Sequence, residues 1–237
     1  MTASISVLIS NNFEQEENYG RCFAVRFFVL VDFMDYKTVK NFGTDEYIVK
    51  KSRFIGYVKP VSTVDEAMAF VNEIKTKHRD ARHNVFAYML KDGNKRYSDD
   101  GEPQGTAGIP VLDVIEKERL FNIVVVVTRY FGGILLGGGG LVRAYSHTAK
   151  LAIDAASIVT KTLCTTGEIA CDYGFYGRIP MVVNEFGGII LDTVFEDNVK
   201  IKIKLPKSGE KLISDKIIDL SGGKYNFSKI SEEFSEI

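Results

Sequence analysis

The 237-residue sequence lacks most of the features that mark secreted, metal-binding or membrane-spanning chains. Its three cysteines, Cys22, Cys164 and Cys171, show no CxxC spacing, which argues against a zinc site or disulfide framework and for a reducing compartment. The one candidate targeting stretch, FAVRFFVLV at residues 23–31, is too short to span a bilayer, and an acidic segment precedes it. We therefore expect a cytoplasmic protein with no membrane partner, metal or cofactor.

An excess of charge of either sign is also missing. Thirty basic and 31 acidic side chains give a formal net charge of −1, so no global field attracts nucleic acid, and any such binding must come from a local patch. The chain is not disordered, because 45% of its residues are hydrophobic, with 16 Phe and 11 Tyr. Its length allows one large domain or two small ones.

The first two thirds of the chain alternate between strand and helix patterns. Thr63 is a candidate N-cap, with Glu66 three residues on, for a helix with apolar residues at helical spacing. The apolar, β-branched run at 122–131 is typical of a central strand buried on both faces. The other predicted elements are a strand pair or one bent strand at 47–61, a strand at 84–90, a short helix at 108–117 and an amphipathic helix at 141–155.

The pattern restarts at about residue 162, so we place a domain boundary near residues 159–161. The order of elements beyond it is βαββαβ, which is the ferredoxin-like plan. The predicted elements are strands at 162–173, 188–197, 198–206 and 224–234, with helices at 177–188 and 210–223. We expect an α+β protein of two domains.

Four consecutive glycines, Gly137, Gly138, Gly139 and Gly140, join the buried strand to the amphipathic helix. Such a run allows close backbone approach, and the helix start offers open N–H groups and a positive dipole end, so with Arg143 it is a candidate anion site. Neither GxGxxG nor the P-loop pattern is present. Tight packing between strand and helix explains the run equally well.

The stretch SDDGEPQGTAG at 98–108 places Asp99, Asp100 and Glu102 within four residues. Carboxylates at this spacing can hold a cation or act as acid and base, but a polar turn accounts for them too, and no metal-loop pattern matches. Arg129 ends the buried strand, and His83 precedes another. Both are candidates for binding or catalysis, although a histidine beside a strand is more often a structural group.

Three lysines, Lys200, Lys202 and Lys204, alternate with apolar residues near the end of the chain. A period of two places all three ammonium groups on one face of a sheet and the apolar set on the other. Usually this is a solvated face, but it is also a candidate contact surface for the phosphates of a nucleic acid.

The motifs KKSRFIG, DARHN, SDDGEPQGTAGIP and VVVVTRYFGGILLGGGGLVRAYS together resemble the YigZ/IMPACT family over residues 34–237. The resemblance implies a domain at 34–160 related to the second domain of ribosomal protein S-five, and one at 161–237 similar to domain five of translocation factor EF-G. Within these motifs the glycines and six other residues match the family's characteristic positions, with no established catalytic role: His83, Asp99, Asp100, Glu102, Arg129 and Tyr130. Residues 1–33 lie outside the resemblance, and we expect them to be a poorly packed extension.

Two functions of different classes follow. The first is a non-enzymatic protein that contacts RNA or the ribosome and regulates translation, which the resemblance and the three lysines favour. The second is an enzyme acting on a phosphorylated or anionic small molecule, which requires the SDDGEP and glycine-rich loops to meet in one cleft. A protein-docking module is not distinguished from the first.

Overall fold

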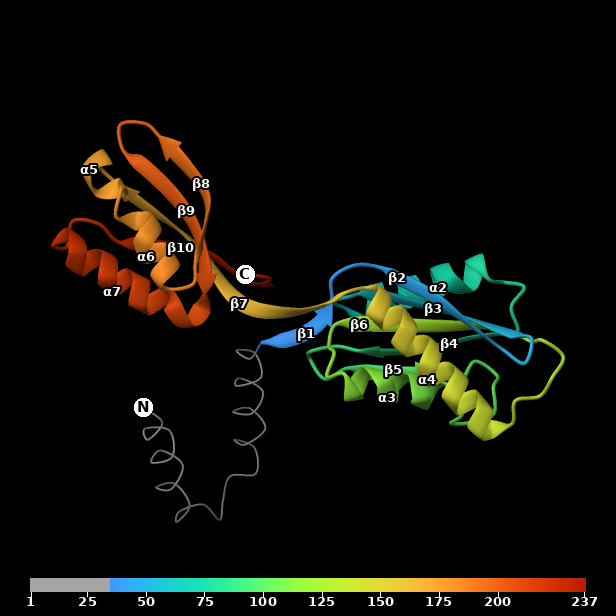
Figure 1. Cartoon of the computed structure of the whole chain (residues 1–237). Coiled ribbons are helices and arrows are strands. Elements are labelled where there is room, and N and C mark those ends of the chain that lie inside the picture. The colour runs from blue at the N-terminus through green and yellow to red at the C-terminus, as the bar shows by residue number, and fades with distance from the viewer. Residues whose placement is uncertain (1–34) are drawn as a thin grey trace, which may run out of the picture. The chain divides into compact units, whose positions relative to one another are not determined.

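The computed structural model describes residues 35–237, so the predicted extension, Cys22 and the 23–31 stretch lie outside the described residues. Two five-stranded sheets with helices form this part of the chain (Figure 1), which confirms the predicted α+β class. None of its helices is long and apolar enough to cross a membrane.

The first sheet has the strand order β2-β3-β6-β4-β5, with antiparallel pairing throughout. Its strands are β2 (Gly43–Val49), β3 (Ser52–Pro60), β4 (His83–Met89), β5 (Lys95–Ser98) and β6 (Ile123–Tyr130). The helices of this half are α2 (Val64–Lys77), α3 (Gly108–Lys117) and α4 (Gly138–Ala155). The predicted pair at 47–61 is the β2–β3 hairpin, and Thr63 caps α2 by accepting from the N–H of Glu66, as predicted.

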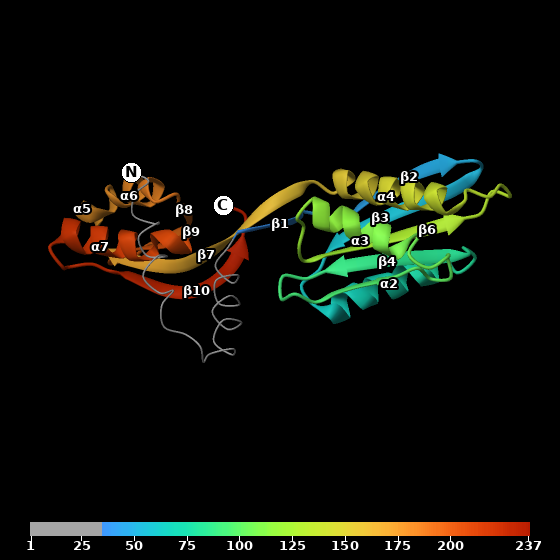
Figure 2. The ribbon, with the colours of Figure 1, turned by 90° about the horizontal axis from the view of Figure 1, so that it is seen from below.

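Helices cover both faces of this sheet (Figure 2). Helices α3 and α4 lie on one face and α2 lies on the other. The central strand β6 sends Val125 and Val127 toward α3 and α4, and Val124 and Val126 toward α2. The prediction of a central strand buried on both faces is therefore confirmed, and each face has its own hydrophobic core.

Helix α4 packs very closely on the β2–β3 hairpin. A Cβ placed on Gly56 would lie 2.7 Å from the carbonyl oxygen of Thr148 and 2.9 Å from the Cβ of Ala152, so only glycine allows this approach. The sequence predicts six residues on the apolar face of this helix, and all but the last are buried: Leu141, Ala144, Tyr145, Thr148, Ala152 and Ala155.

The second sheet forms the C-terminal half, in which β9 and β10 flank β7 and β8 lies beyond β9. The elements are β7 (Ile158–Cys171), α5 (Tyr173–Tyr176), α6 (Ile179–Glu185), β8 (Ile189–Phe195), β9 (Val199–Pro206), a 3₁₀ turn η1 (Lys207–Gly209), α7 (Glu210–Ser221) and β10 (Phe227–Ser235). Their order is βαββαβ, as the sequence predicted. The helix expected at 177–188 is α6, and the short helix α5 before it was not predicted.

Strand β7 is longer than the sequence indicated. Its first residues, Ile158 to Lys161, pair with β1 (Tyr36–Val39), a short strand that the sequence did not reveal. Its later residues pair with β9 and β10. The boundary placed near residues 159–161 therefore falls inside one continuous strand.

Candidate functional site

Four connections meet at one end of the first sheet, which we call the loop end. They are the β2–β3 turn at residues 50–51, the α2–β4 loop at 78–82, the β5–α3 loop at 99–107 and the β6–α4 loop at 131–137. The strand register brings them together, because Arg53 is opposite Tyr130 and His83 is opposite Arg129. Most of the candidate residues from the sequence lie here.

Asp99 holds the start of α3. Its two carboxylate oxygens accept hydrogen bonds from the backbone N–H groups of Gly105, Ala107 and Gly108, at 2.9, 3.1 and 2.8 Å. The N-cap residue of α3, Ala107, has no side-chain oxygen to do this. Asp99 therefore acts as the cap of the helix from eight residues away, and its acceptors are occupied.

Asp100 joins three elements. Its carboxylate accepts from Lys75 Nζ at 2.7 Å and from the backbone N–H of Asn84 at 2.7 Å. Its carbonyl oxygen accepts from Nδ1 of His83 at 2.8 Å, so Nδ1 carries a proton. The backbone of Asp100 is left-handed, with φ of 43°, which aspartate tolerates better than most residues.

Glu102 lies at the centre of a buried polar cluster. Its Oε1 accepts from Arg129 Nη1 at 2.5 Å and from the hydroxyl of Tyr145 at 2.8 Å, and His83 Nε2 lies 3.8 Å away. The side chains of Glu102 and Arg129 are only 3% and 7% exposed. Burial raises the pKa of Tyr145 and the Glu102 carboxylate raises it further, so this phenol remains a donor. The sequence predicted Tyr145 only as part of the apolar face of α4, not as a hydrogen-bond partner of Glu102.

Two glycines shape the loop between β6 and α4, Gly132 through a close contact and Gly137 through its backbone conformation. A Cβ on Gly132 would lie 1.9 Å from the carbonyl carbon of Lys51, so the loop crosses the β2–β3 turn where only glycine fits. Gly137 is the N-cap of α4 and has φ of 73°, a left-handed conformation that glycine adopts readily. The glycine run was expected to lie at the start of this helix, and the helix begins within the run, at Gly138.

The SDDGEP and glycine-rich loops adjoin one another. A Cβ on Gly138 would lie 3.8 Å from the Cγ2 of Thr106, and Tyr145 connects α4 to Glu102. The enzymatic alternative requires the two loops to meet in one cleft, and these contacts bring them side by side. The carboxylates, however, are committed to a helix cap, a lysine and an arginine. Among residues 35–237 no group of His, Cys, Asp or Glu side chains is arranged to hold a metal ion.

The loop end also carries five exposed cations, of which the sequence analysis selected only Arg143, as part of the candidate anion site. They are Lys50, Lys51, Arg79, Arg82 and Arg143, and within the described part of the chain none has an acidic partner within 4.0 Å. The nearby acidic groups are already engaged, Asp80 by the hydroxyl of Tyr130 and the others as described above. The sequence signals that could have revealed the other four cations are KK, in the β2–β3 turn, and RDAR, in the loop between α2 and β4.

The three lysines of β9 point away from the core of the second sheet, as predicted. Val199, Ile201, Ile203 and Leu205 are buried beneath the helices, and the alternating lysines lie on the opposite face, which we call the lysine face. Acidic groups balance it. Lys200 pairs with Glu196 at 3.0 Å, Lys204 pairs with Glu233 at 2.7 Å, and the register partners of Lys202 are Glu168 and Asp192.

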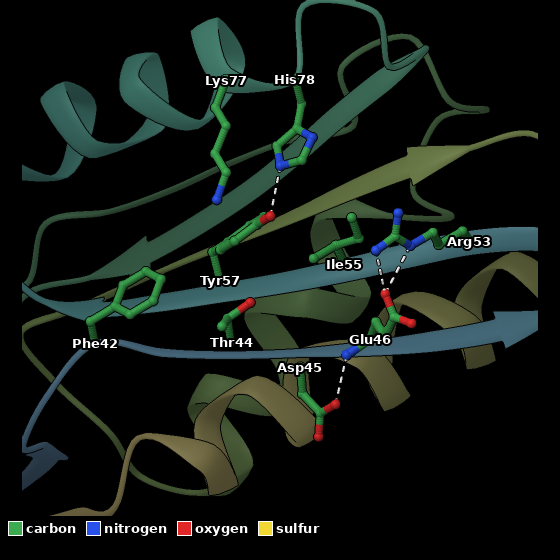
Figure 3. Close-up of a pocket in the computed structure, with 9 residues that line it drawn as sticks. All are labelled: Phe42, Thr44, Asp45, Glu46, Arg53, Ile55, Tyr57, Lys77 and His78. Carbon is green, nitrogen blue, oxygen red and sulfur yellow. Dashed lines mark hydrogen bonds and ion pairs between the residues drawn. The ribbon is translucent and has the colours of Figure 1, made fainter.

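A hollow of about 500 Å³ lies on the α2 side of the first sheet (Figure 3). It opens between the β2–β3 hairpin and the C-terminal end of α2. The residues that line it are Phe42, Thr44, Asp45, Glu46, Arg53, Ile55, Tyr57, Lys77 and His78. The sequence analysis named none of these, because they come from three separate segments whose side chains meet only in the folded sheet.

A chain of hydrogen bonds runs from this hollow to the surface. The hydroxyl of Tyr130 donates to Asp80 at 3.1 Å, so its oxygen accepts from Nδ1 of His78 at 2.8 Å. Nε2 of His78 is then unprotonated and accepts from the hydroxyl of Tyr57 at 2.6 Å. Burial lowers the pKa of His78, and Lys77 lowers it further, in keeping with a neutral ring. His78, rather than His83, is thus the histidine at a hollow.

Comparison with known proteins identifies both halves of the chain. Residues 50–153 match the Impact N-terminal domain, and residues 169–224 match a domain of unknown function, DUF1949. The chain is 37% identical over 191 residues to the IMPACT family member YvyE of Bacillus subtilis, covering 80% of this chain and 88% of that protein. It is 35% identical over 188 residues to the IMPACT family member YigZ of Escherichia coli, covering 78% and 92%.

Other relatives match over a shorter stretch. Protein IMPACT of Rattus norvegicus is 32% identical over 93 residues, which covers 37% of this chain and 29% of that protein. A crystal structure of a hypothetical protein is similar with a TM-score of 0.55 and 33% sequence identity, covering 84% of this chain and 98% of the other. The match to full-length bacterial proteins therefore spans both halves.

Proposed function

The chain belongs to the IMPACT family, and from this premise we propose that it is a non-enzymatic protein that binds RNA or the ribosome and regulates translation. The observation that carries the proposal is the loop end, where five exposed cations have no acidic partner within residues 35–237 while the neighbouring carboxylates are engaged. Such a surface favours phosphate groups, since it gains charge neutralisation without first breaking ion pairs. A cytoplasmic location accompanies this role.

The distribution of charge supports the first half of the chain as the main interface. Residues 35–157 contain 18 basic and 15 acidic side chains, whereas residues 158–237 contain 10 and 12. From the sequence we expected the lysine face to contact nucleic-acid phosphates. Because acidic groups balance its charge, we propose it as a secondary contact surface for RNA. We also propose that the first half is related to the second domain of ribosomal protein S-five and that the second half has a ferredoxin-like fold. The βαββαβ order supports the ferredoxin-like assignment.

Co-sedimentation of the full chain with ribosomes tests the proposal. We expect retention at low salt, reduced by Lys50→Glu with Lys51→Glu more than by Lys200→Glu with Lys202→Glu. If the chain binds single-stranded RNA on the ribosome, the loss of two phosphate contacts should make the plot of log affinity against log salt concentration shallower by about 1.4. Free protein at every salt concentration, or equal binding by both double variants and the parent, would overturn it.

The enzymatic alternative has less support. Its loops adjoin, but Asp99, Asp100 and Glu102 already serve a helix cap, a lysine and a buried arginine. Arg129 is likewise paired, so it is not free to clamp a substrate anion. Conversion of a phosphorylated metabolite that Asp100→Asn abolishes without loss of stability would restore this alternative.

A further inference from the structure

We propose that the hollow in Figure 3 binds a nucleoside monophosphate group, meaning a flat heteroaromatic ring that carries a phosphate. The site lies on the α2 side of the first sheet. It does not include the five unpaired cations of the loop end on which the proposed RNA interface depends. The two proposals can therefore fail independently.

The hollow offers a stacking surface for a flat ring. Phe42 is held by ring contacts with Tyr57 and Phe70, at centroid distances of 6.3 and 6.2 Å, yet it remains 50% exposed. The buried side chains of Ile55 and Tyr57 continue this apolar surface along β3. Aromatic side chains fixed in place with an open face are the usual platforms for nucleobases.

One cation at the hollow is available for an anion. Lys77 extends from the last turn of α2 over the ring of Tyr57, with Nζ 4.8 Å from the ring centroid. No acidic group in residues 35–237 lies within 4.0 Å of this ammonium group, unlike Lys75, which pairs with Asp100. A phosphate near Tyr57 would meet a charge that is already oriented toward it.

The opposite side of the hollow can recognise the polar edge of a base. Arg53 and Glu46 form an ion pair at 2.6 Å, with side chains 52% and 45% exposed. An exposed pair of this kind contributes little to stability, so both groups can turn toward a ligand. Glu46 would accept from an exocyclic amino group of the base, and Arg53 would donate to an acceptor on the same edge.

The hydrogen-bonded chain behind the hollow holds these groups in place. His78 joins the end of α2 to Tyr57 of β3 and Tyr130 of β6, which fixes both the ring below Lys77 and the backbone that carries it. His78 is a positioning residue here, since its two ring nitrogens are occupied and it is not available as a third cation. A site organised before binding loses less conformational freedom when the ligand arrives.

Simpler ligands would leave part of this surface unused. Inorganic phosphate would not cover Phe42 and Ile55, and a neutral aromatic molecule would leave Lys77 unpaired. The volume of about 500 Å³ is within the range of ligand pockets and accommodates one nucleotide. The ligand is either a free nucleotide or one unstacked residue of an RNA strand, since both present the same group.

Isothermal titration of the full chain with adenosine 5′-monophosphate tests the proposal, with adenosine, inorganic phosphate and a short oligoadenylate as the other probes. We expect the monophosphate to bind more tightly than adenosine or phosphate alone. Phe42→Ala and Lys77→Gln should each weaken it about tenfold, because the first removes the stacking surface and the second the charge that faces the phosphate. Lys117→Gln, which removes an exposed, unpaired cation on α3, is the matched control and should change nothing.

Every outcome bears on the site. A monophosphate that does not bind at millimolar concentration, or that binds the parent and both variants equally, overturns the proposal. Equal affinity for inorganic phosphate overturns the role of the ring. Tighter binding of the oligoadenylate that depends on Phe42 supports an RNA strand as the source, whereas equal binding supports a free nucleotide. The Lys50→Glu, Lys51→Glu variant should retain monophosphate binding whether or not it binds ribosomes.

Discussion

Glu102 and Arg129 form an ion pair at 2.5 Å in the interior of the first half of the chain, where both side chains are almost completely buried. The pair joins the β5–α3 loop to the end of β6, and the hydroxyl of Tyr145 ties the same carboxylate to α4. The guanidinium group also lies over the rings of Phe54 and Phe131, at 5.4 and 5.5 Å. Three elements of the loop end therefore depend on one carboxylate.

Replacing this carboxylate should be strongly destabilising. Glu102→Gln leaves the buried guanidinium without a counter-charge, and we expect a loss of about 3–5 kcal/mol in the free energy of unfolding. Chemical denaturation monitored by circular dichroism measures it. The matched control is Glu116→Gln, which breaks an exposed pair with Lys95 at 2.7 Å and should cost less than about 1 kcal/mol. Equal effects of the two substitutions would contradict this account.

Most of the fold could be predicted from the sequence because its signals are local. The β-branched run of β6, the Thr63 cap and the alternating apolar residues of β9 each specify an element by themselves. Strand β1 was missed because four residues, YKTV, exist as a strand only through pairing with β7. Helix α5 was missed because its four residues, Tyr173–Tyr176, are too few to show a helical period in the sequence.

The sequence identified several residues of the candidate site but not the role of each one. His83, Asp100, Glu102 and Arg129 do meet, because the elements that they flank end together. Their partners lie far away in the chain, with Tyr145 separated from Glu102 by 43 positions. The hollow depends entirely on such distant contacts, since His78 reaches Tyr130 across 52 positions.

Asp99 should behave as a helix cap rather than as an acid or base. Asp99→Ala removes the acceptor for three backbone N–H groups at the start of α3, and we expect it to cost about 1–2 kcal/mol. Asp99→Asn keeps one acceptor oxygen and should cost clearly less. Thermal unfolding of the two variants distinguishes the effects, and an equal loss for both would show that the charge, not the cap, is what matters.

The glycines of the β6–α4 loop should differ sharply in their tolerance of substitution. Gly132→Ala would place a Cβ 1.9 Å from the carbonyl carbon of Lys51, and we expect a loss of about 1–3 kcal/mol from the forced shift of the turn. Gly139→Ala meets no atom within 4 Å and lies in the first turn of α4, so it should be neutral or stabilise the helix by up to about 1 kcal/mol.

The same pair of substitutions separates packing from ligand binding. If Gly139 serves only to start the helix, Gly139→Ala keeps both stability and ribosome binding. If its backbone approaches a phosphate, the variant remains stable but binds more weakly in co-sedimentation. A stable Gly132→Ala protein would contradict the close contact with the β2–β3 turn.

His78 should make the stability of the chain depend on pH near neutrality. Its pKa is lowered in the folded state by burial and by Lys77, so between its ordinary value of 6.5 and its folded value the unfolded chain binds more protons. The stabilisation is therefore fully present above about pH 6.5 and is lost as the pH falls toward the lower, folded pKa. Urea denaturation at a series of pH values from 7.5 to about 5 measures this loss.

His78→Gln provides the comparison, because His83 and His147 are common to both proteins and their contributions cancel in the difference. The variant should be less stable at pH 7.5, having lost a ring that joins Tyr57 to Tyr130, but its stability should fall less between pH 7 and pH 5. Carboxylates with lowered pKa, such as Glu232 and Glu233, titrate below this window and do not interfere. Parallel pH profiles for the two proteins would mean that the buried ring takes up its proton without opposing the fold, and the hydrogen-bonded chain from Tyr57 to Asp80 would then not have the polarity assigned to it.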